Sequence, residues 1–161
     1  MNALAPTRPA QLLARRVRLA TRPAAVAEAR SHVRDTIRAW ELPVDQETAI
    51  LLTSELVTNA VSHETGEHVT LVVRGSHDRL RVEVHDTSCA VPVPMDAPAD
   101  AETGRGLMLV DNLADDWGFY RTPAGKAVYF MLLLRPEPVE VTHRRPRRGP
   151  ARSSRCNGAK R

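Results

Sequence analysis

Two neighbouring segments with helical periodicity constrain the fold of this chain more than any other feature. Between residues 24 and 40, apolar residues recur every three or four positions, which predicts an amphipathic helix. A second helix is expected from Pro43 to about His63, because proline suits the first turn of a helix and a wide apolar stripe follows it. Each helix must bury its apolar side against another layer of secondary structure.

Strand-like segments supply that second layer. The expected strands are residues 15–21, 69–74, 80–86, 117–121 and 125–134. Residues 75–78 have the turn chemistry of a hairpin, and a short third helix is expected to follow Gly106. The apolar run over residues 128–134 is typical of a central strand that is buried on both faces. The order predicts an α/β two-layer sandwich, in which the helices cover one face of a mixed, mostly antiparallel sheet.

Charge is distributed unevenly along the sequence. The formal net charge is +4, yet residues 1–135 carry 15 Lys and Arg against 17 Asp and Glu, whereas residues 136–161 carry 8 against 2. The basic character therefore belongs to the C-terminal part, and the rest gives no electrostatic reason to expect nucleic acid. We expect a flexible N-terminal segment (residues 1–14), one globular domain (15–135) and a disordered Arg- and Pro-rich tail (136–161).

The cysteines and the apolar runs bear on the cellular compartment. Neither Cys89 nor Cys156 belongs to a CxxC pair, and no apolar run approaches the roughly 18 to 20 residues of a membrane span. Arginines interrupt the N-terminal segment, which argues against a cleaved signal peptide. These features predict a soluble, cytoplasmic protein without a membrane partner.

Two polar residues of the second predicted helix are candidates for phosphoryl-transfer chemistry. Glu55 and Asn59 stand four positions apart, so both project from one helix face. The carbonyl oxygen of Asn59 suits Mg²⁺, which takes few ligands from protein and the rest from phosphates and water. Glu55 could accept the proton of an attacking hydroxyl or water. The same spacing also fits a solvated helix face, so the pair alone does not decide between the two.

Two further candidate sites lie downstream. Asp86 ends a predicted strand, where its carboxylate could accept a hydrogen bond from the exocyclic amine of adenine, although aspartate is also common at ordinary strand ends. The GRGL segment of Gly104, Arg105, Gly106 and Leu107 opens a helix, whose unpaired N–H groups favour phosphate. Two glycines also make an ordinary loop. The irregular residues 89–103 between these sites could serve as a lid.

The order and spacing of these motifs resemble the Bergerat ATPases, the fold shared by gyrase and histidine kinases. The resemblance rests on ELVTNAVSH (residues 55–63), HDTS (85–88) and TGRGLMLVDNLAD (103–115), and it covers roughly residues 15–135. The sequence is most similar to the histidine-kinase-like ATPase domains of anti-sigma-factor serine kinases. This likeness implies the Bergerat fold, binding of ATP and Mg²⁺, and phosphorylation of a serine or threonine on another protein.

The resemblance implies a role for each matched position. Glu55 matches the proposed general base, Asn59 the amide that chelates magnesium, and Asp86 the adenine-binding aspartate. Gly104 and Gly106 match the glycines of the loop over the phosphates, and Arg105 and Leu107 belong to the same segment.

Two positions depart from the family pattern. Asp86 is followed by Thr87-Ser88-Cys89-Ala90 instead of spaced glycines, which leaves the backbone less free to approach a nucleotide. Lys126 stands where related ATPases often have a threonine that helps to hold adenine. Its ammonium could reach a phosphate or extend into water, and we expect the second.

Three functional hypotheses follow. The leading one is a regulatory kinase that binds ATP and Mg²⁺, phosphorylates an anti-sigma-factor antagonist protein and sequesters a sigma factor. These partners, and a homodimer, are implied by the resemblance alone. The second is a non-catalytic module in which ATP stabilises a protein-binding surface. The third is nucleic-acid binding through the basic tail, which would depend steeply on salt concentration.

Overall fold

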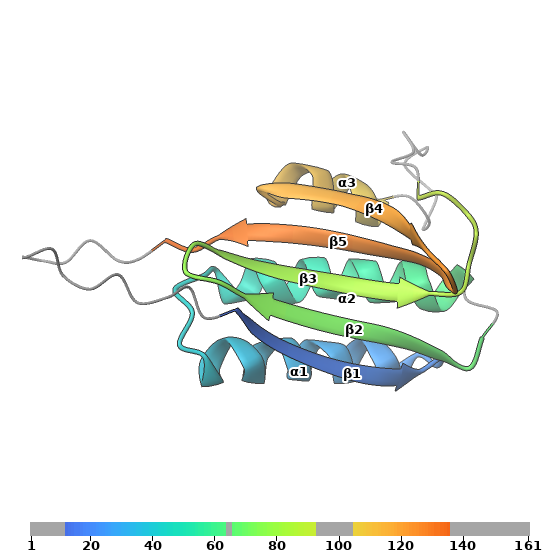
Figure 1. Cartoon of the computed structure of the whole chain (residues 1–161), viewed down its shortest axis with the longest axis horizontal. Helices are drawn as coiled ribbons and strands as arrows, with labels where there is room; N and C mark the ends of the chain where they lie inside the picture. The colour runs from blue at the N-terminus through green and yellow to red at the C-terminus, as the bar shows by residue number, and fades with distance from the viewer. Residues whose placement is uncertain (1–11, 64–65, 93–104, 136–161) are drawn as a thin grey trace, which may run out of the picture.

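A five-stranded sheet and a layer of three helices make up the part of the chain that the computed structural model describes, residues 12–63, 66–92 and 105–135 (Figure 1). In chain order the elements are β1 (Leu13–Ala20), α1 (Ala24–Ala39), α2 (Gln46–His63), β2 (His68–Gly75), β3 (Arg79–Asp86), α3 (Arg105–Leu113), β4 (Asp116–Thr122) and β5 (Gly125–Leu133). Every predicted helix and strand is present in the predicted order. Residues 93–103 of the predicted lid, residues 1–11 of the N-terminal segment and the tail lie outside the described residues. The expected flexible segment ends earlier than residue 14, because β1 begins at Leu13.

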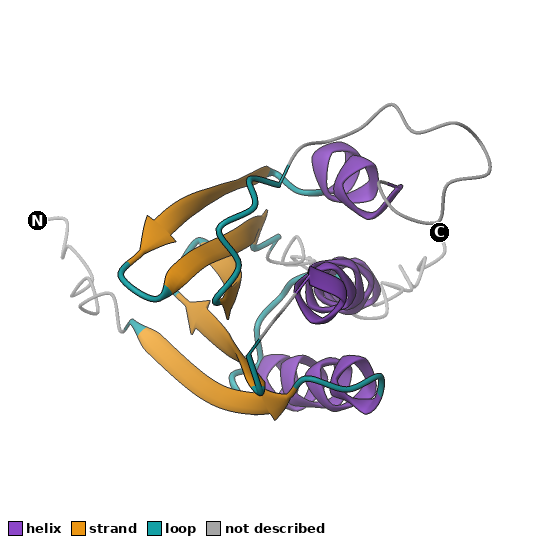
Figure 2. Cartoon of the chain, turned by 90° about the vertical axis from the view of Figure 1, so that its right-hand side faces the viewer, coloured by secondary structure: helices purple, strands orange, loops and turns teal. Residues whose placement is uncertain are grey.

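The sheet has the strand order β1-β2-β3-β5-β4, and all four of its strand pairs are antiparallel. The strand β5 lies between β3 and β4, so its expected interior position is confirmed. Its apolar run has a different cause from the expected burial on both faces, because the helices of the described residues all cover one face of the sheet (Figure 2). On the open face, the β5 residues Tyr129 and Met131 are half-buried by their neighbours in the sheet.

The helices α1 and α2 pack side by side over the sheet, and α3 packs against α2. Their buried residues recur at the spacing that predicted the helices, for example Ala25, Ala29, Val33 and Ile37 of α1. These side chains meet the inward residues of the sheet, among which Phe130 of β5 is completely buried. The apolar core therefore fills the space between the two layers.

The helix α2 begins at Gln46, slightly later than the position of Pro43 predicted. Asp45 ends the preceding turn, and its Oδ1 accepts hydrogen bonds from the backbone N–H groups of Glu47 and Thr48 at 3.1 and 3.2 Å. The side chain of Thr48 also donates to Asp45, and these bonds hold the pKa of Asp45 below its usual value. A carboxylate that caps the first N–H groups fixes where the helix starts.

A buried carboxylate lies on the open face of the sheet. Glu83 of β3 is only 3% exposed. Its Oε1 accepts a hydrogen bond from Nε of Arg81 at 2.6 Å, and Nε of Arg74 lies 3.6 Å away. Its Oε2 lies 3.1 Å from Nε2 of His85 and accepts a hydrogen bond from the Tyr120 hydroxyl at 3.0 Å. Hydrogen bonds with His85, then Arg81 and Tyr120, lower the pKa of Glu83 to about 2.

Candidate functional site

Glu55 and Asn59 lie on successive turns of α2, at the place where α3 packs against this helix. The contact is close at Gly106, because a β-carbon added there would lie 2.5 Å from Oε2 of Glu55 and 3.4 Å from Nδ2 of Asn59. Glycine is thus the residue that leaves room for both side chains. The structure brings together three residues that the sequence placed in two separate motifs.

Within the part of the chain that the structure describes, the polar groups of Glu55 and Asn59 have no partner. Both residues are half-buried, and within the described residues neither side chain takes part in a hydrogen bond or an ion pair. Half-buried polar groups still reach water, which a ligand can displace when it offers hydrogen bonds of its own. A carboxylate and an amide that share one face and remain open therefore suit a ligand that brings its own polar atoms.

Asp86 ends β3 on the face of the sheet that the helices cover. Its side chain is only 2% exposed. Its Oδ1 accepts a hydrogen bond from Nζ of Lys126 at 2.8 Å and another from the backbone N–H of Ser88 at 3.0 Å. The ends of β3 and α2 lie at the same end of the molecule, on the right in Figure 1. The strand that Asp86 closes and the helix that carries Asn59 therefore end at the same end of the molecule.

The position of Lys126 is a correction to the sequence analysis. Its side chain is 9% exposed and pairs with Asp86, so the ammonium does not extend into water as expected. The register of the sheet explains this, because Asp86 and Lys126 are directly opposite each other on β3 and β5. An ammonium that is buried beside a carboxylate is the usual arrangement for a lysine removed from water.

Gly125, immediately before Lys126, lets β5 approach the end of β3. A β-carbon at Gly125 would collide with the backbone of Asp86 and Thr87. The close approach of the two strands holds Lys126 against Asp86. Local sequence patterns do not reveal this contact, since it depends on which residues of β3 and β5 face each other.

The GRGL segment is described only in part. Gly104 lies outside the described residues, and so does the side chain of Arg105, although Arg105 is the first residue of α3. Leu107 is 6% exposed and belongs to the apolar core. Its side chain therefore anchors α3 to the core, and any contact of Leu107 with a ligand would be made by its backbone.

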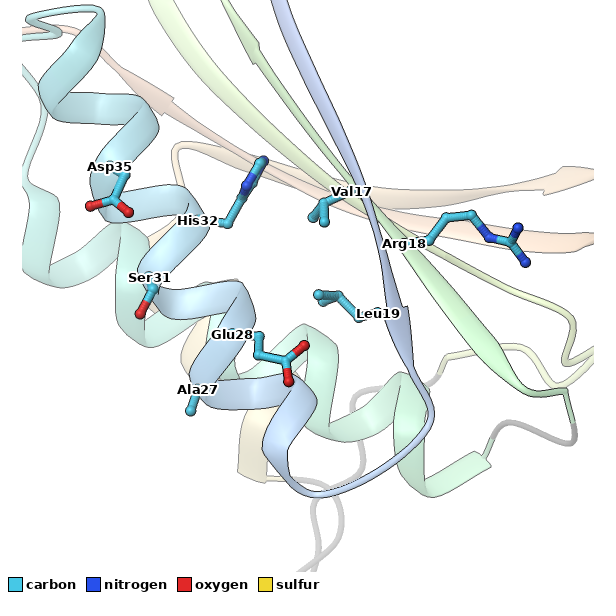
Figure 3. A pocket seen from close by; sticks show the side chains of 8 residues that line it. All are labelled: Val17, Arg18, Leu19, Ala27, Glu28, Ser31, His32 and Asp35. Atoms are coloured by element: carbon cyan, nitrogen blue, oxygen red, sulfur yellow. The ribbon is translucent and has the colours of Figure 1, made fainter.

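A separate hollow lies between β1 and α1, on the opposite side of the helix layer from α3 (Figure 3). Its lining residues are Val17, Arg18, Leu19, Ala27, Glu28, Ser31, His32 and Asp35. His32 points from α1 toward Val17, and its buried Nε2 has no hydrogen-bond partner among the described residues. Burial, and next the charge of Arg15, lower the pKa of His32. None of the candidate residues from the sequence lines this hollow.

Neither a cluster of metal ligands nor a membrane span is found in the described part of the chain. In residues 12–63, 66–92 and 105–135, no group of three or more His, Cys, Asp and Glu side chains could hold a metal ion. No helix among these residues is both long and apolar enough to cross a membrane.

Comparison with known protein families identifies the class of this chain. The family model of the histidine kinase-like ATPase domain matches residues 19–132. This match covers most of the sequence, and the chain belongs to that family. A search of the curated proteins finds no match.

A solved structure has the same fold. The crystal structure of the RsbU and RsbW domains of Rv1364c from Mycobacterium tuberculosis superimposes with a TM-score of 0.57 and 16% sequence identity, covering 77% of this chain and 33% of that chain. At this identity the likeness shows the fold alone. The sandwich of three helices on an antiparallel sheet is the Bergerat ATPase fold, and the chain is an ATP-binding domain of the histidine kinase-like ATPase family.

Proposed function

We propose that this chain is a regulatory protein kinase that transfers a phosphoryl group from ATP to a serine or threonine of an antagonist protein, and that it also binds a sigma factor. The observation that carries the proposal is the contact of Gly106 with Glu55 and Asn59. It unites a carboxylate, an amide and the start of a helix, which are groups that can serve phosphoryl transfer. Membership of the ATPase family supports the use of ATP. The anti-sigma role rests on the sequence resemblance.

Each residue has a distinct role in this proposal. The amide oxygen of Asn59 would hold Mg²⁺, which bridges the phosphates and neutralises their charge when bound. Glu55 would accept the proton of the incoming hydroxyl group. The backbone N–H groups of Gly104, Arg105 and Gly106 would bind phosphate oxygens at the start of α3. Asp86 would accept a hydrogen bond from the base.

The test separates ATP binding from phosphoryl transfer. Binding is measured by isothermal titration calorimetry with ATP, with and without Mg²⁺, and transfer is measured with radiolabelled ATP and candidate antagonist proteins. Glu55→Gln should bind ATP as wild type does, because the amide keeps the size of the side chain, while transfer falls roughly 100- to 10,000-fold. Asn59→Ala should weaken both, since the Mg²⁺ ligand is lost.

Matched controls lie on the same helix. Glu47 and Thr58 of α2 are exposed, so Glu47→Gln and Thr58→Ala should leave binding and transfer unchanged. If Glu55→Gln transfers phosphate as fast as wild type, Glu55 is not the general base. If wild type binds ATP but phosphorylates no protein that it binds, the kinase proposal is wrong, and a non-catalytic module stabilised by ATP takes its place.

A further inference from the structure

The ion pair of Asp86 and Lys126 offers both an acceptor and donors of hydrogen bonds. Both known hydrogen bonds of the Asp86 carboxylate go to Oδ1, one from Lys126 and one from the backbone of Ser88. No hydrogen bond to Oδ2 occurs within the described residues, so this oxygen remains an acceptor. An ammonium has three N–H donors, of which Lys126 uses one on Asp86. Acceptor and donors therefore stand side by side.

The adjacent ammonium changes how well the carboxylate can discriminate between adenine and guanine. A lone carboxylate accepts a hydrogen bond from the 6-amino group of adenine. It repels the 6-oxo group of guanine, because the carboxylate and the oxo group are both acceptors. An adjacent ammonium can donate to the guanine oxygen, while the carboxylate accepts from the N–H groups of the same base. The pair therefore matches the hydrogen-bonding edges of both purines.

Because both side chains are buried, their pairing strongly affects which ligand can bind. The side chains of Asp86 and Lys126 are 2% and 9% exposed, so water has little access to replace a missing partner. In buried sites an unmatched polar group strongly disfavours the wrong ligand. The opposite positions of the two residues on β3 and β5, together with the close approach at Gly125, keep the ammonium beside the carboxylate.

We propose that Lys126 is a specificity-determining residue that admits guanine nucleotides alongside adenine nucleotides. This inference rests on the proposed nucleotide site. The position follows from the sheet register, and the chemistry follows from the buried ion pair. The domain would then bind purine nucleoside triphosphates with little preference between a 6-amino and a 6-oxo group on the base.

The experiment compares the dissociation constants of MgATP and MgGTP for the full chain by isothermal titration calorimetry. For wild type, the two constants should lie within about tenfold of each other. Lys126→Met keeps the aliphatic length and removes the donor, so the preference for ATP should rise ~10- to 150-fold, chiefly through weaker GTP binding. Lys126→Arg keeps charge and donors and should retain most GTP binding. Arg121→Met is the control, because the exposed Arg121 is opposite Lys126 on β4.

The outcomes separate this inference from the proposed function. A wild-type preference for ATP above about a hundredfold leaves the proposed function intact and overturns the inference, as does an unchanged preference in a folded Lys126→Met. Circular dichroism shows whether that variant folds, and the wild-type ratio decides the matter if it does not. A wild type that binds neither nucleotide overturns both proposals.

Discussion

Replacing Glu83 by glutamine should destabilise the domain in a way that depends on pH. The substitution keeps the shape of the side chain but removes the charge that Arg81 and His85 contact on the open sheet face. Because the Glu83 side chain is only 4% exposed, an amide in its place gains little hydration to offset the lost contacts with these groups. Breaking one partner of a buried ion pair is far more costly than removing an exposed charge.

The lowered pKa of Glu83 gives the size of the expected loss of stability. It falls from the ordinary 4.5 to about 2 in the folded protein, with hydrogen bonding to His85 as the largest cause. A pKa lowered by folding stabilises the native state above the unfolded value, and the stabilisation disappears as the pH falls through the folded value. At 1.36 kcal/mol for each pKa unit, the carboxylate contributes about 3 kcal/mol at neutral pH.

Urea denaturation followed by circular dichroism measures this contribution. At pH 7, Glu83→Gln should lower the free energy of unfolding by about 3 kcal/mol relative to wild type. The difference should shrink between pH 4.5 and pH 2, because the wild-type carboxyl becomes protonated in that range. Glu28→Gln is the matched control, since Glu28 pairs with Arg22 at the surface with both side chains largely exposed. Such a pair contributes about 0 to 1 kcal/mol.

Two results would refute this reasoning. One is a loss of stability in Glu83→Gln that is no larger than in Glu28→Gln. The other is a difference from wild type that stays constant down to about pH 2, because the effect would then come from packing and not from the charge of Glu83.

Four further predictions concern the site and its support. Asp86→Asn should weaken ATP binding ~10- to 150-fold by calorimetry, because the base loses a charged acceptor, and an unchanged constant would remove Asp86 from the site. Truncation after Arg135 should leave ATP affinity nearly intact, whereas a several-fold loss would show that the tail contacts the nucleotide. Gly106→Ala should slow phosphoryl transfer, since the new methyl group would displace the carboxylate of Glu55, and full activity would contradict that contact. Gly125→Ala should lower the free energy of unfolding by about 1 to 3 kcal/mol in urea, because its methyl group would meet the backbone of Asp86 and Thr87.

The sequence alone determined the features that depend on local periodicity. The spacing of apolar residues located the helices and strands, and it placed Glu55 and Asn59 on one face of α2. The same order of elements predicted helices on one face of a sheet, which the structure confirms. These features follow from contacts within a few residues along the chain, where side-chain spacing and backbone geometry are directly linked.

Only the tertiary structure decided which distant residues meet. Lys126 and Asp86 are 40 positions apart, and Tyr120 and Glu83 are 37 apart, so both contacts depend on the pairing register of β3, β5 and β4. A shift of one residue would move each of these side chains to the other face of the sheet. The register is set by packing of the whole core and by close approaches such as that at Gly125, which no short stretch of sequence contains. For that reason the sequence identified Asp86 as a candidate, but the expectation that Lys126 extends into water was wrong.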